Sequence, residues 1–157
     1  MNIFHLHKDP KTCAEYHCDK HVVKMILETG QMLSTAYRRH FDDGVELYKT
    51  AYPKHPMTIW VGNSGGNFFW TVKLLDQLIY QYTLRYNKVH TTIRISNLLH
   101  SKYKNWHDLT GDFLKPPLCM PDQYKSDDYI KSYRDYYIGE KKRFAKYTSV
   151  DIPDFLV

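Results

Sequence analysis

The chain has 157 residues, of which 43% are hydrophobic and 25% charged, so it has the size and composition of one globular domain and not of a disordered or fibrous protein. Its 22 Lys and Arg residues outnumber its 17 Asp and Glu residues, and the resulting net charge of +5 favours an anionic partner such as nucleic acid. Three cysteines are too few for a disulfide framework, no apolar run could span a bilayer and no signal peptide opens the chain, so we expect a cytoplasmic protein without membrane contact.

Residues 1–157 are expected to form a single, compact, all-α domain, because apolar residues recur at helical spacing and no strand pattern is strong. Asp9 followed by Pro10 predicts the start of a long first helix, which continues to about His40. The apolar face of this helix is made of Cys18, Val22, Met25, Ile26, Thr29, Leu33 and Ala36.

A short helix is predicted over Val45–Tyr52, and the clearest helix of the chain follows over Asn67–Tyr86. Apolar residues alternate there at spacings of three and four, namely Phe68, Val72, Leu75, Ile79, Tyr82 and Tyr86. A shorter helix is predicted over Thr91–Tyr103. The segment Asn105–Tyr124 is rich in proline and predicts a long loop packed over the body.

The last predicted helix, from about Asp127 to about Tyr147, is basic and rich in tyrosine. Stackable rings that alternate with cations suit the binding of a nucleic-acid strand. We therefore predict that Tyr133, Tyr137 and Lys141 bind substrate. The alternative is an amphipathic helix whose rings face the core and whose basic residues face solvent.

Four polar residues, His17, His21, Lys24 and Glu28, are spaced i, i+4, i+7 and i+11, which places them on one stripe of the first helix. A carboxylate at the edge of burial can act as a base or stabilise positive charge, and imidazole or ammonium groups can carry protons. We predict these four residues to be catalytic. The alternative is a solvated helix face with a Lys24–Glu28 ion pair worth roughly a few tenths of a kcal/mol.

A metal site is a further possibility for His17 and His21, because histidines at i and i+4 can hold zinc together. Cys18 and Asp19 point elsewhere on the helical wheel, so we predict no metal and no other cofactor. His55 lies in a stiff Lys54-His55-Pro56 loop and is a candidate for substrate binding. The glycine-rich helix start Asn63–Asn67 offers backbone N–H groups to a phosphate, with a plain helix cap as the alternative.

The segment His17–Ala36 resembles a motif found in a family of small bacteriophage proteins, HCDKHVVKMILETxQxLSTA, with Gly30 at the first variable place. Similar features further along are His55-Pro56, Trp60, Ser64, Asn67, Trp70, Arg85-Tyr86 and Met120–Lys125. The resemblance covers most of the chain, and it adds Asn67 and Arg85 to the predicted substrate-binding residues.

More distantly, the arrangement resembles the bacteriophage pyrimidine-dimer DNA glycosylase/AP lyases, known as endonuclease V. This resemblance implies a compact all-α fold with a catalytic Glu on the first long helix, here Glu28, and a His seven residues earlier, here His21. That family uses the α-amine of an N-terminal Thr as nucleophile, whereas Asn2 stands here, a residue before which Met is usually retained. Lys24 as the amine, or water activated by Glu28, are the alternatives.

Together these patterns predict an enzyme that cleaves an N-glycosidic bond of a damaged or modified base in DNA or a nucleotide. Glu28 stabilises charge on the sugar or activates water, His17 and His21 position substrate or carry protons, and Lys24 contacts phosphate or supplies the amine. Two alternatives stay open: a non-enzymatic phage protein that binds nucleic acid or inhibits a host factor, and a metal-dependent hydrolase that uses His17 and His21. The expected partner is nucleic acid, above all DNA.

Overall fold

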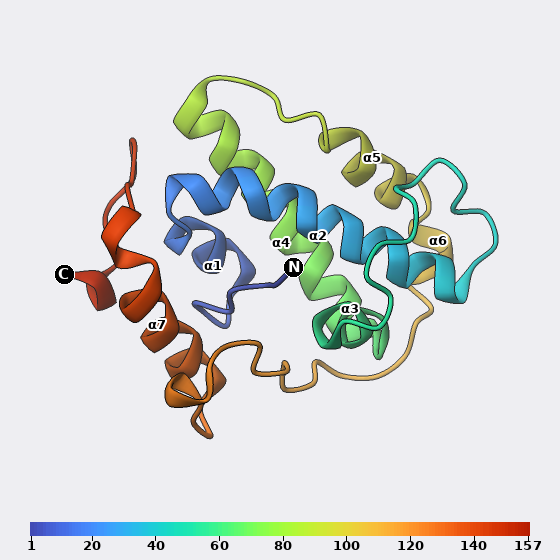
Figure 1. Cartoon of the computed structure of the whole chain (residues 1–157). Helices are drawn as coiled ribbons and strands as arrows, with labels where there is room; N and C mark the ends of the chain where they lie inside the picture. Colours follow the sequence, from blue (N-terminus) through green and yellow to red (C-terminus); the bar gives the residue numbers. More distant parts are fainter.

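Two long helices, α2 (Asp19–His40) and α4 (Gly65–Tyr86), cross at the centre of the molecule, and the shorter helices surround them (Figure 1). The computed structural model describes residues 1–157 and contains no strand, which confirms the predicted all-α class. None of its helices combines the length and the apolar character that crossing a bilayer requires.

The remaining helices are short. They are α1 (Pro10–Tyr16), α3 (Pro56–Gly62), α5 (Ile93–Ser101), α6 (Tyr103–Trp106) and α7 (Tyr129–Glu140), with 3₁₀ turns at Asp122–Tyr124, Lys142–Phe144 and Asp154–Leu156. Side-chain caps define several starts, since Asp9 accepts from the N–H of Thr12 in α1 and Asp128 accepts from Ile130 and Lys131 in α7. The central helix α4 begins two residues before the predicted Asn67 and ends at the predicted Tyr86.

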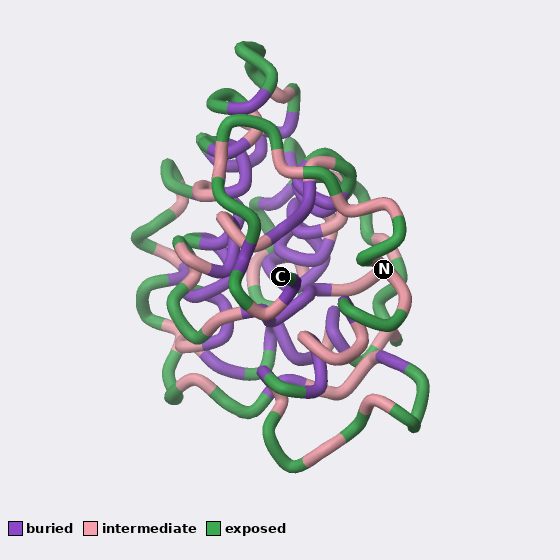
Figure 2. Tube along the Cα trace, turned by 90° about the vertical axis from the view of Figure 1, so that its left-hand side faces the viewer, coloured by how far each residue is buried: buried purple, intermediate pink, exposed green.

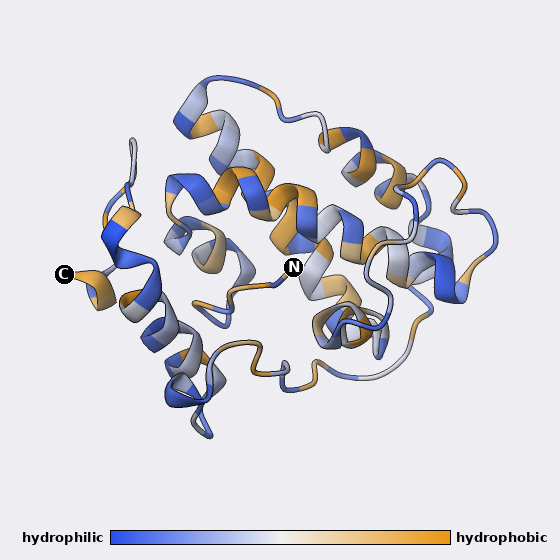
Figure 3. Ribbon diagram, in the orientation of Figure 1, coloured by the Kyte–Doolittle hydropathy of each residue, from blue (hydrophilic) through white to orange (hydrophobic).

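The core lies where α2, α4 and the extended N-terminal residues meet. Apolar residues recur along both long helices (Figure 3), and the buried residues gather in the middle of the molecule (Figure 2). Ile3 and Leu6 are buried with them, and Phe4 packs between His21 of α2 and Tyr137 of α7. The alternation of apolar and polar residues at the N-terminus therefore serves to pin this segment to the centre of the fold.

The single helix predicted from Pro10 to His40 is wrong, because the chain leaves helical geometry at His17 and Cys18. Both residues are extended, with ψ angles of 132° and 161°. The guanidinium of Arg85 donates to the carbonyl oxygens of Glu15 and His17, and the hydroxyl of Tyr137 accepts from the N–H of Cys18. These distant partners replace the hydrogen bonds that a continuous helix would make.

The short helix predicted over Val45–Tyr52 is also wrong. The guanidinium of Arg38 donates to the carbonyl oxygens of Val45, Leu47 and Tyr48, which holds this segment as an irregular turn against α2. The last helix is shorter than predicted, because α7 ends at Glu140 and a 3₁₀ turn over Lys142–Phe144 follows.

Candidate active site

Glu28 lies between two amino groups at the point where α2 meets the start of the chain. Its Oε2 atom accepts the backbone N–H of Asn2 at 3.0 Å and lies 3.7 Å from the α-amino nitrogen of Met1. Its Oε1 atom lies 3.6 Å from Nζ of Lys24. The carboxylate side chain is only 13% exposed, whereas that of Lys24 is 66% exposed. Glu28 is therefore a largely buried anion flanked by two cations, and not half of an open surface pair.

The N-terminal residues reach Glu28 because Asn2 is held by its own side chain. Its Nδ2 group donates to the carbonyl oxygen of Cys119 at 2.9 Å, and its Oδ1 atom accepts the N–H of Ile3. Cys119 belongs to the long proline-rich loop that precedes α7. Sequence reasoning missed the contacts of these N-terminal residues with the pocket, because Asn2 lies 26 residues from Glu28 and 117 residues from Cys119 along the chain.

His21 lies one turn before Lys24 and Met25 with its ring wedged between aromatic side chains. It stacks on Phe4, with ring centroids 4.6 Å apart and planes 5° apart, and meets the ring of Phe144 edge-on. Its Nδ1 atom lies 2.8 Å from the hydroxyl of Tyr137. Burial lowers the pKa of His21 to about 3, and the nearby cations, Lys141, Lys24 and Lys20 among them, add to the effect. The imidazole is therefore neutral at physiological pH.

His55 reaches the same place from the start of α3. Its Nδ1 atom accepts the N–H of Met57 at 3.1 Å, so the residue caps α3 while its ring lies near the chain start. Burial lowers the pKa of His55, and the α-amino group of Met1 lowers it further against the opposing effect of Glu28. A second neutral imidazole is thus present beside the carboxylate.

These groups line one cavity of about 570 Å³, which we call the Glu28 pocket. Its polar lining comes from Met1, Asn2, His21, Lys24, Glu28, His55 and Lys141, and the loop Pro117–Met120 and the ring of Tyr136 supply apolar walls. The volume lies within the range of about 300–1,000 Å³ that small-molecule sites occupy. The structure thus brings together five predicted residues: His21, Lys24, Glu28, His55 and Lys141.

Three other predicted residues are buried and do not line the Glu28 pocket. His17 is fully buried at the α1–α2 junction, where its Nδ1 atom contacts the carbonyl oxygen of Cys13, because the helix break turns it away from His21. Tyr133 and Tyr137 are fully buried as well; the Tyr133 hydroxyl donates to the carbonyl oxygen of Pro117. The structure contradicts direct substrate contact by these three side chains, and the rings of Tyr133 and Tyr137 face the core.

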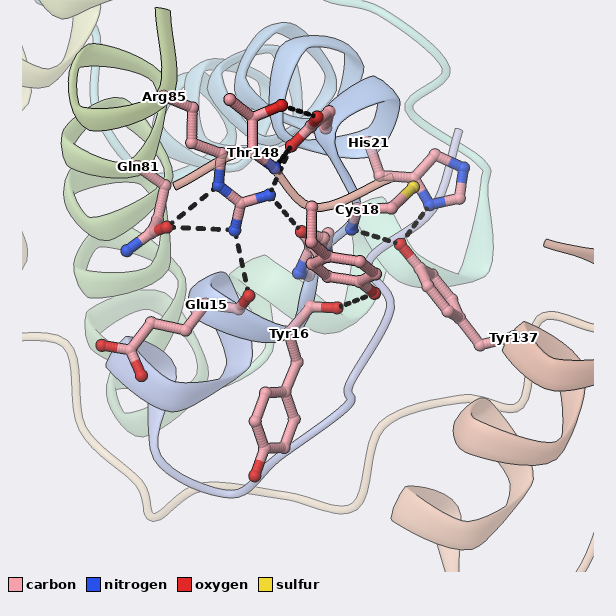
Figure 4. A network of polar contacts seen from close by, with 11 residues as sticks. Glu15, Tyr16, Cys18, His21, Gln81, Arg85, Tyr137 and Thr148 are labelled. Carbon is pink, nitrogen blue, oxygen red and sulfur yellow. Dashed lines mark hydrogen bonds and ion pairs between the residues drawn. The ribbon is translucent and has the colours of Figure 1, made fainter. Parts of the chain in front are cut away.

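Asn67 and Arg85 likewise have structural partners of their own. Asn67 is buried, donates to the carbonyl oxygen of Trp60 and accepts the N–H of Leu114. The guanidinium of Arg85 is fully buried and binds Gln81, the α1–α2 junction and Asp19 (Figure 4). Neither side chain is free to bind a substrate, so these two predictions are corrected to structural roles.

The glycine-rich start of α4 is a packed helix cap. The N–H groups of Gly65 and Gly66 donate to the carbonyl oxygens of Thr110 and Gly111, and the hydroxyl of Ser64 accepts from Asn67. A β-carbon on Gly65 would lie 1.9 Å from the carbonyl oxygen of Leu109, so only glycine lets the loop approach this closely. The N–H groups predicted for a phosphate are therefore already occupied.

The metal-dependent alternative required at least three suitable ligands. No three His, Cys, Asp or Glu side chains come together in a way that could hold a metal ion. His17 and His21 in particular lie on different elements, and Nδ1 of each contacts a separate oxygen.

Comparison with known proteins gives one match. A family model described as "Pyrimidine dimer DNA glycosylase" matches residues 1–94, which is more than half of the chain. No curated protein and no solved structure matches. The matched segment contains Met1, His21, Lys24, Glu28 and His55, whereas the loop Pro117–Met120 and α7, which complete the Glu28 pocket, lie beyond it.

Proposed function

Because the chain belongs to the pyrimidine dimer DNA glycosylase family, we propose that the Glu28 pocket is the site at which it cleaves the glycosidic bond of a damaged base. Membership implies DNA glycosylase activity on damaged bases, with DNA as substrate, and agrees with the resemblance drawn from the sequence. The observation that carries the assignment is the position of Glu28, a largely buried carboxylate between two amino groups in a cavity whose volume is typical of small-molecule sites.

Glu28 acts on the sugar in this mechanism. As the bond between C1′ and the base nitrogen breaks, its electron pair leaves with the base and positive charge develops on C1′ and the ring oxygen. A carboxylate held in a partly desolvated site stabilises that charge more strongly than it could in water. The N–H of Asn2 keeps one oxygen of Glu28 in place, so little reorganisation is needed when the charge appears.

The nucleophile is an amine beside Glu28, and two are placed for the role: the α-amino group of Met1 and the ε-amino group of Lys24. Glu28 accepts a proton from the ammonium form, and the amine lone pair then forms a bond to C1′ as the base departs. Glu28 then returns its proton to the ring oxygen, the departed base takes a second proton from the nitrogen, and the sugar ring opens to give a protonated imine between the protein and the DNA. Asn2 stands where the resembled family has its Thr. Of the two amines we propose that of Met1 as the nucleophile rather than that of Lys24, because Asn2 holds the start of the chain in the pocket.

The two imidazoles donate hydrogen bonds to the leaving base. His21 and His55 are neutral because burial lowers the pKa of each, so they carry N–H groups that can donate to a departing base without adding a fixed charge. Lys141, at the rim of the pocket, contacts a backbone phosphate of the DNA.

A single substitution at Glu28 tests this assignment. Glu28→Gln keeps the size of the side chain and removes its charge, so turnover of a DNA duplex that carries one pyrimidine dimer should fall on the order of 10²-fold or more, with little change in affinity. Glu46→Gln, at an exposed position in the turn after α2, is the matched control and should retain full activity. An active Glu28→Gln enzyme would overturn the proposed site.

Reductive trapping then identifies the nucleophile. Borohydride should fix the imine and give a covalent protein–DNA product whose peptide map carries the adduct on Met1. An extra residue fused before Met1 should abolish trapping, whereas Lys24→Arg should leave it intact. An adduct on Lys24 would show that the ε-amino group of Lys24 is the nucleophile. Cleavage without any adduct would show that Glu28 activates water instead.

A further inference from the structure

One edge of the His21 ring is fixed by the protein, and the other faces the pocket. Phe4 covers a face of the ring and Tyr137 contacts Nδ1, as described above. Nε2 has no hydrogen-bond partner in the protein, yet it is not sealed in the interior as the partnerless ring nitrogens of His5 and His17 are. Nε2 is therefore the ring atom that a substrate in the Glu28 pocket can reach.

The Tyr137 hydroxyl has two hydrogen-bond partners, and their chemistry differs. The backbone N–H of Cys18, 2.9 Å away, can only donate, so the Tyr137 oxygen accepts there. The hydroxyl proton then needs an acceptor. Nδ1 of His21 lies 2.8 Å away, whereas the neighbouring Tyr147 hydroxyl is already bonded to the carbonyl oxygen of Tyr16. An imidazole that accepts at Nδ1 carries its own proton on Nε2.

We propose that Tyr137 is a positioning residue that fixes His21 as the Nε2–H tautomer and aims that N–H at the substrate. This inference rests on the proposed function of the Glu28 pocket, because it assigns a device that prepares one of its groups. Tyr137 itself never touches the substrate, since its side chain is fully buried. The tyrosine predicted from sequence to bind the strand thus acts through a histidine of α2.

The first turn of α2, which carries His21, is held in place by contacts with other segments of the chain. Arg85 ties the carbonyl oxygens of Glu15 and His17 and the carboxylate of Asp19 to α4, as Figure 4 shows. The carboxylate of Asp19 also accepts from the N–H and the hydroxyl of Thr148 in the C-terminal segment. Cys18, whose N–H donates to the Tyr137 hydroxyl, is the N-cap residue that directly precedes α2. Tyr137 therefore sets the ring of His21 relative to a backbone that three separate segments hold.

The tautomer can be read directly in the wild-type protein. Two-bond ¹H–¹⁵N correlation spectra distinguish a protonated Nε2 from a protonated Nδ1, and a His21→Gln variant identifies the signal of this residue. We expect the Nε2–H form alone in the wild type. Tyr137→Phe should give a mixture of the two neutral tautomers, because the ring then loses the donor at Nδ1. A wild-type Nδ1–H form would overturn the proposal without any need for a variant to fold.

Kinetics on the dimer-containing duplex separate positioning from a merely structural role. Tyr137→Phe should lower kcat on the order of 10-fold with KM nearly unchanged, less than the ~10²–10³-fold cost of losing a donor outright. In a His21→Ala background the same substitution should have no further effect, because a residue that acts through His21 has nothing left to position. Tyr37→Phe, which removes another buried, hydrogen-bonded hydroxyl remote from the pocket, is the matched control and should leave kcat intact.

The outcomes distinguish this inference from the proposed function. If His21→Ala and Glu28→Gln are impaired but Tyr137→Phe keeps both its tautomer and its kcat, the pocket stands and the role of Tyr137 falls. If Tyr137→Phe lowers kcat equally with and without His21, its effect is structural and the proposal is wrong. If Glu28→Gln is active, the proposed function fails first.

Discussion

At the scale of single residues, the pocket gathers cations around an anion and two neutral imidazoles. Lys20 and Arg143 both lie over the ring of Phe144, at 5.1 and 5.6 Å from its centroid, and Lys141 lies 4.8 Å from that of Tyr136. Lys20 and Lys141 also lie close enough to His21 to lower its pKa, and Lys141 lines the pocket. Long basic side chains that rest on aromatic rings keep their charged ends available to phosphate.

This cluster predicts salt-dependent binding to the DNA backbone. Changing Lys20 and Lys141 together to Gln should weaken duplex binding and reduce the slope of log K against log salt by about one for each phosphate that the variant no longer neutralises. Titration at several salt concentrations measures the slope. Lys104→Gln, at an exposed position on α6 away from the pocket, is the control and should leave the slope unchanged. Equal slopes for the wild type and all the variants would show that the DNA binds to another face of the protein.

At the scale of elements, the junction between α1 and α2 decides which side chains meet. The spacing of His17 and His21 placed them on one helix face, but the two extended residues at the junction send His17 into the core and leave His21 at the pocket. The buried guanidinium of Arg85 is what holds this break open against helix formation.

Removal of Arg85 should therefore be strongly destabilising. Arg85→Met keeps much of the side-chain volume but leaves two backbone carbonyl oxygens without their donor and Asp19 without its ion-pair partner, so the free energy of unfolding should fall by about 3–5 kcal/mol. Chemical denaturation measures this loss. Arg94→Gln is the control, because the guanidinium of Arg94 donates to the carbonyl oxygen of Glu46 at the exposed surface. This substitution should lower the free energy of unfolding by well under about 1 kcal/mol, roughly the value of a surface contact. A similar, small loss for both variants would contradict the anchoring role of Arg85.

The features of these helices that could be predicted from the sequence are those that depend on residues close together along the chain. The seam of α4 and its start after Ser64 follow from spacing and capping, and so does the placement of His21, Lys24 and Glu28 on one face of α2. The break at His17 and the arrival of Met1 at Glu28 depend on Arg85, Tyr137 and Cys119, which lie far away along the chain. No local pattern encodes such pairings, so sequence reasoning found His21, Lys24, Glu28, His55 and Lys141 but not the N-terminal residues or the Pro117–Met120 loop that complete the pocket.

At the scale of the whole molecule, three neutral histidines are built into the interior around Phe4. Burial lowers the pKa of His5 to about 3, that of His17 to about 4 and that of His21 to about 3. His5 lies among Trp60, Trp70 and Tyr133, and neither of its ring nitrogens has a hydrogen-bond partner. Protonation of any of these rings opposes the folded state.

Acid should therefore destabilise the fold well above the range in which its carboxylates titrate. Each folded pKa lies below the unfolded value of about 6.5, so the unfolded chain binds protons first, and stability present above that pH is lost as pH falls toward the folded value. For His5 the loss amounts to about 2 kcal/mol between pH 7 and pH 5. His5→Phe should remove that share of the pH dependence when denaturation curves are compared at the two pH values. An unchanged pH dependence in the variant would show that His5 is not a neutral core residue.

The hydrogen bond from Asn2 to Cys119 also bears on the order of events during folding. It joins residues 117 positions apart, and the contact between His21 and Tyr137 joins residues 116 positions apart. Contacts between residues so distant along the chain form only after the entropy of closing a long loop has been overcome. We therefore expect the helices to form before the Glu28 pocket, which is complete only once these two distant contacts are made.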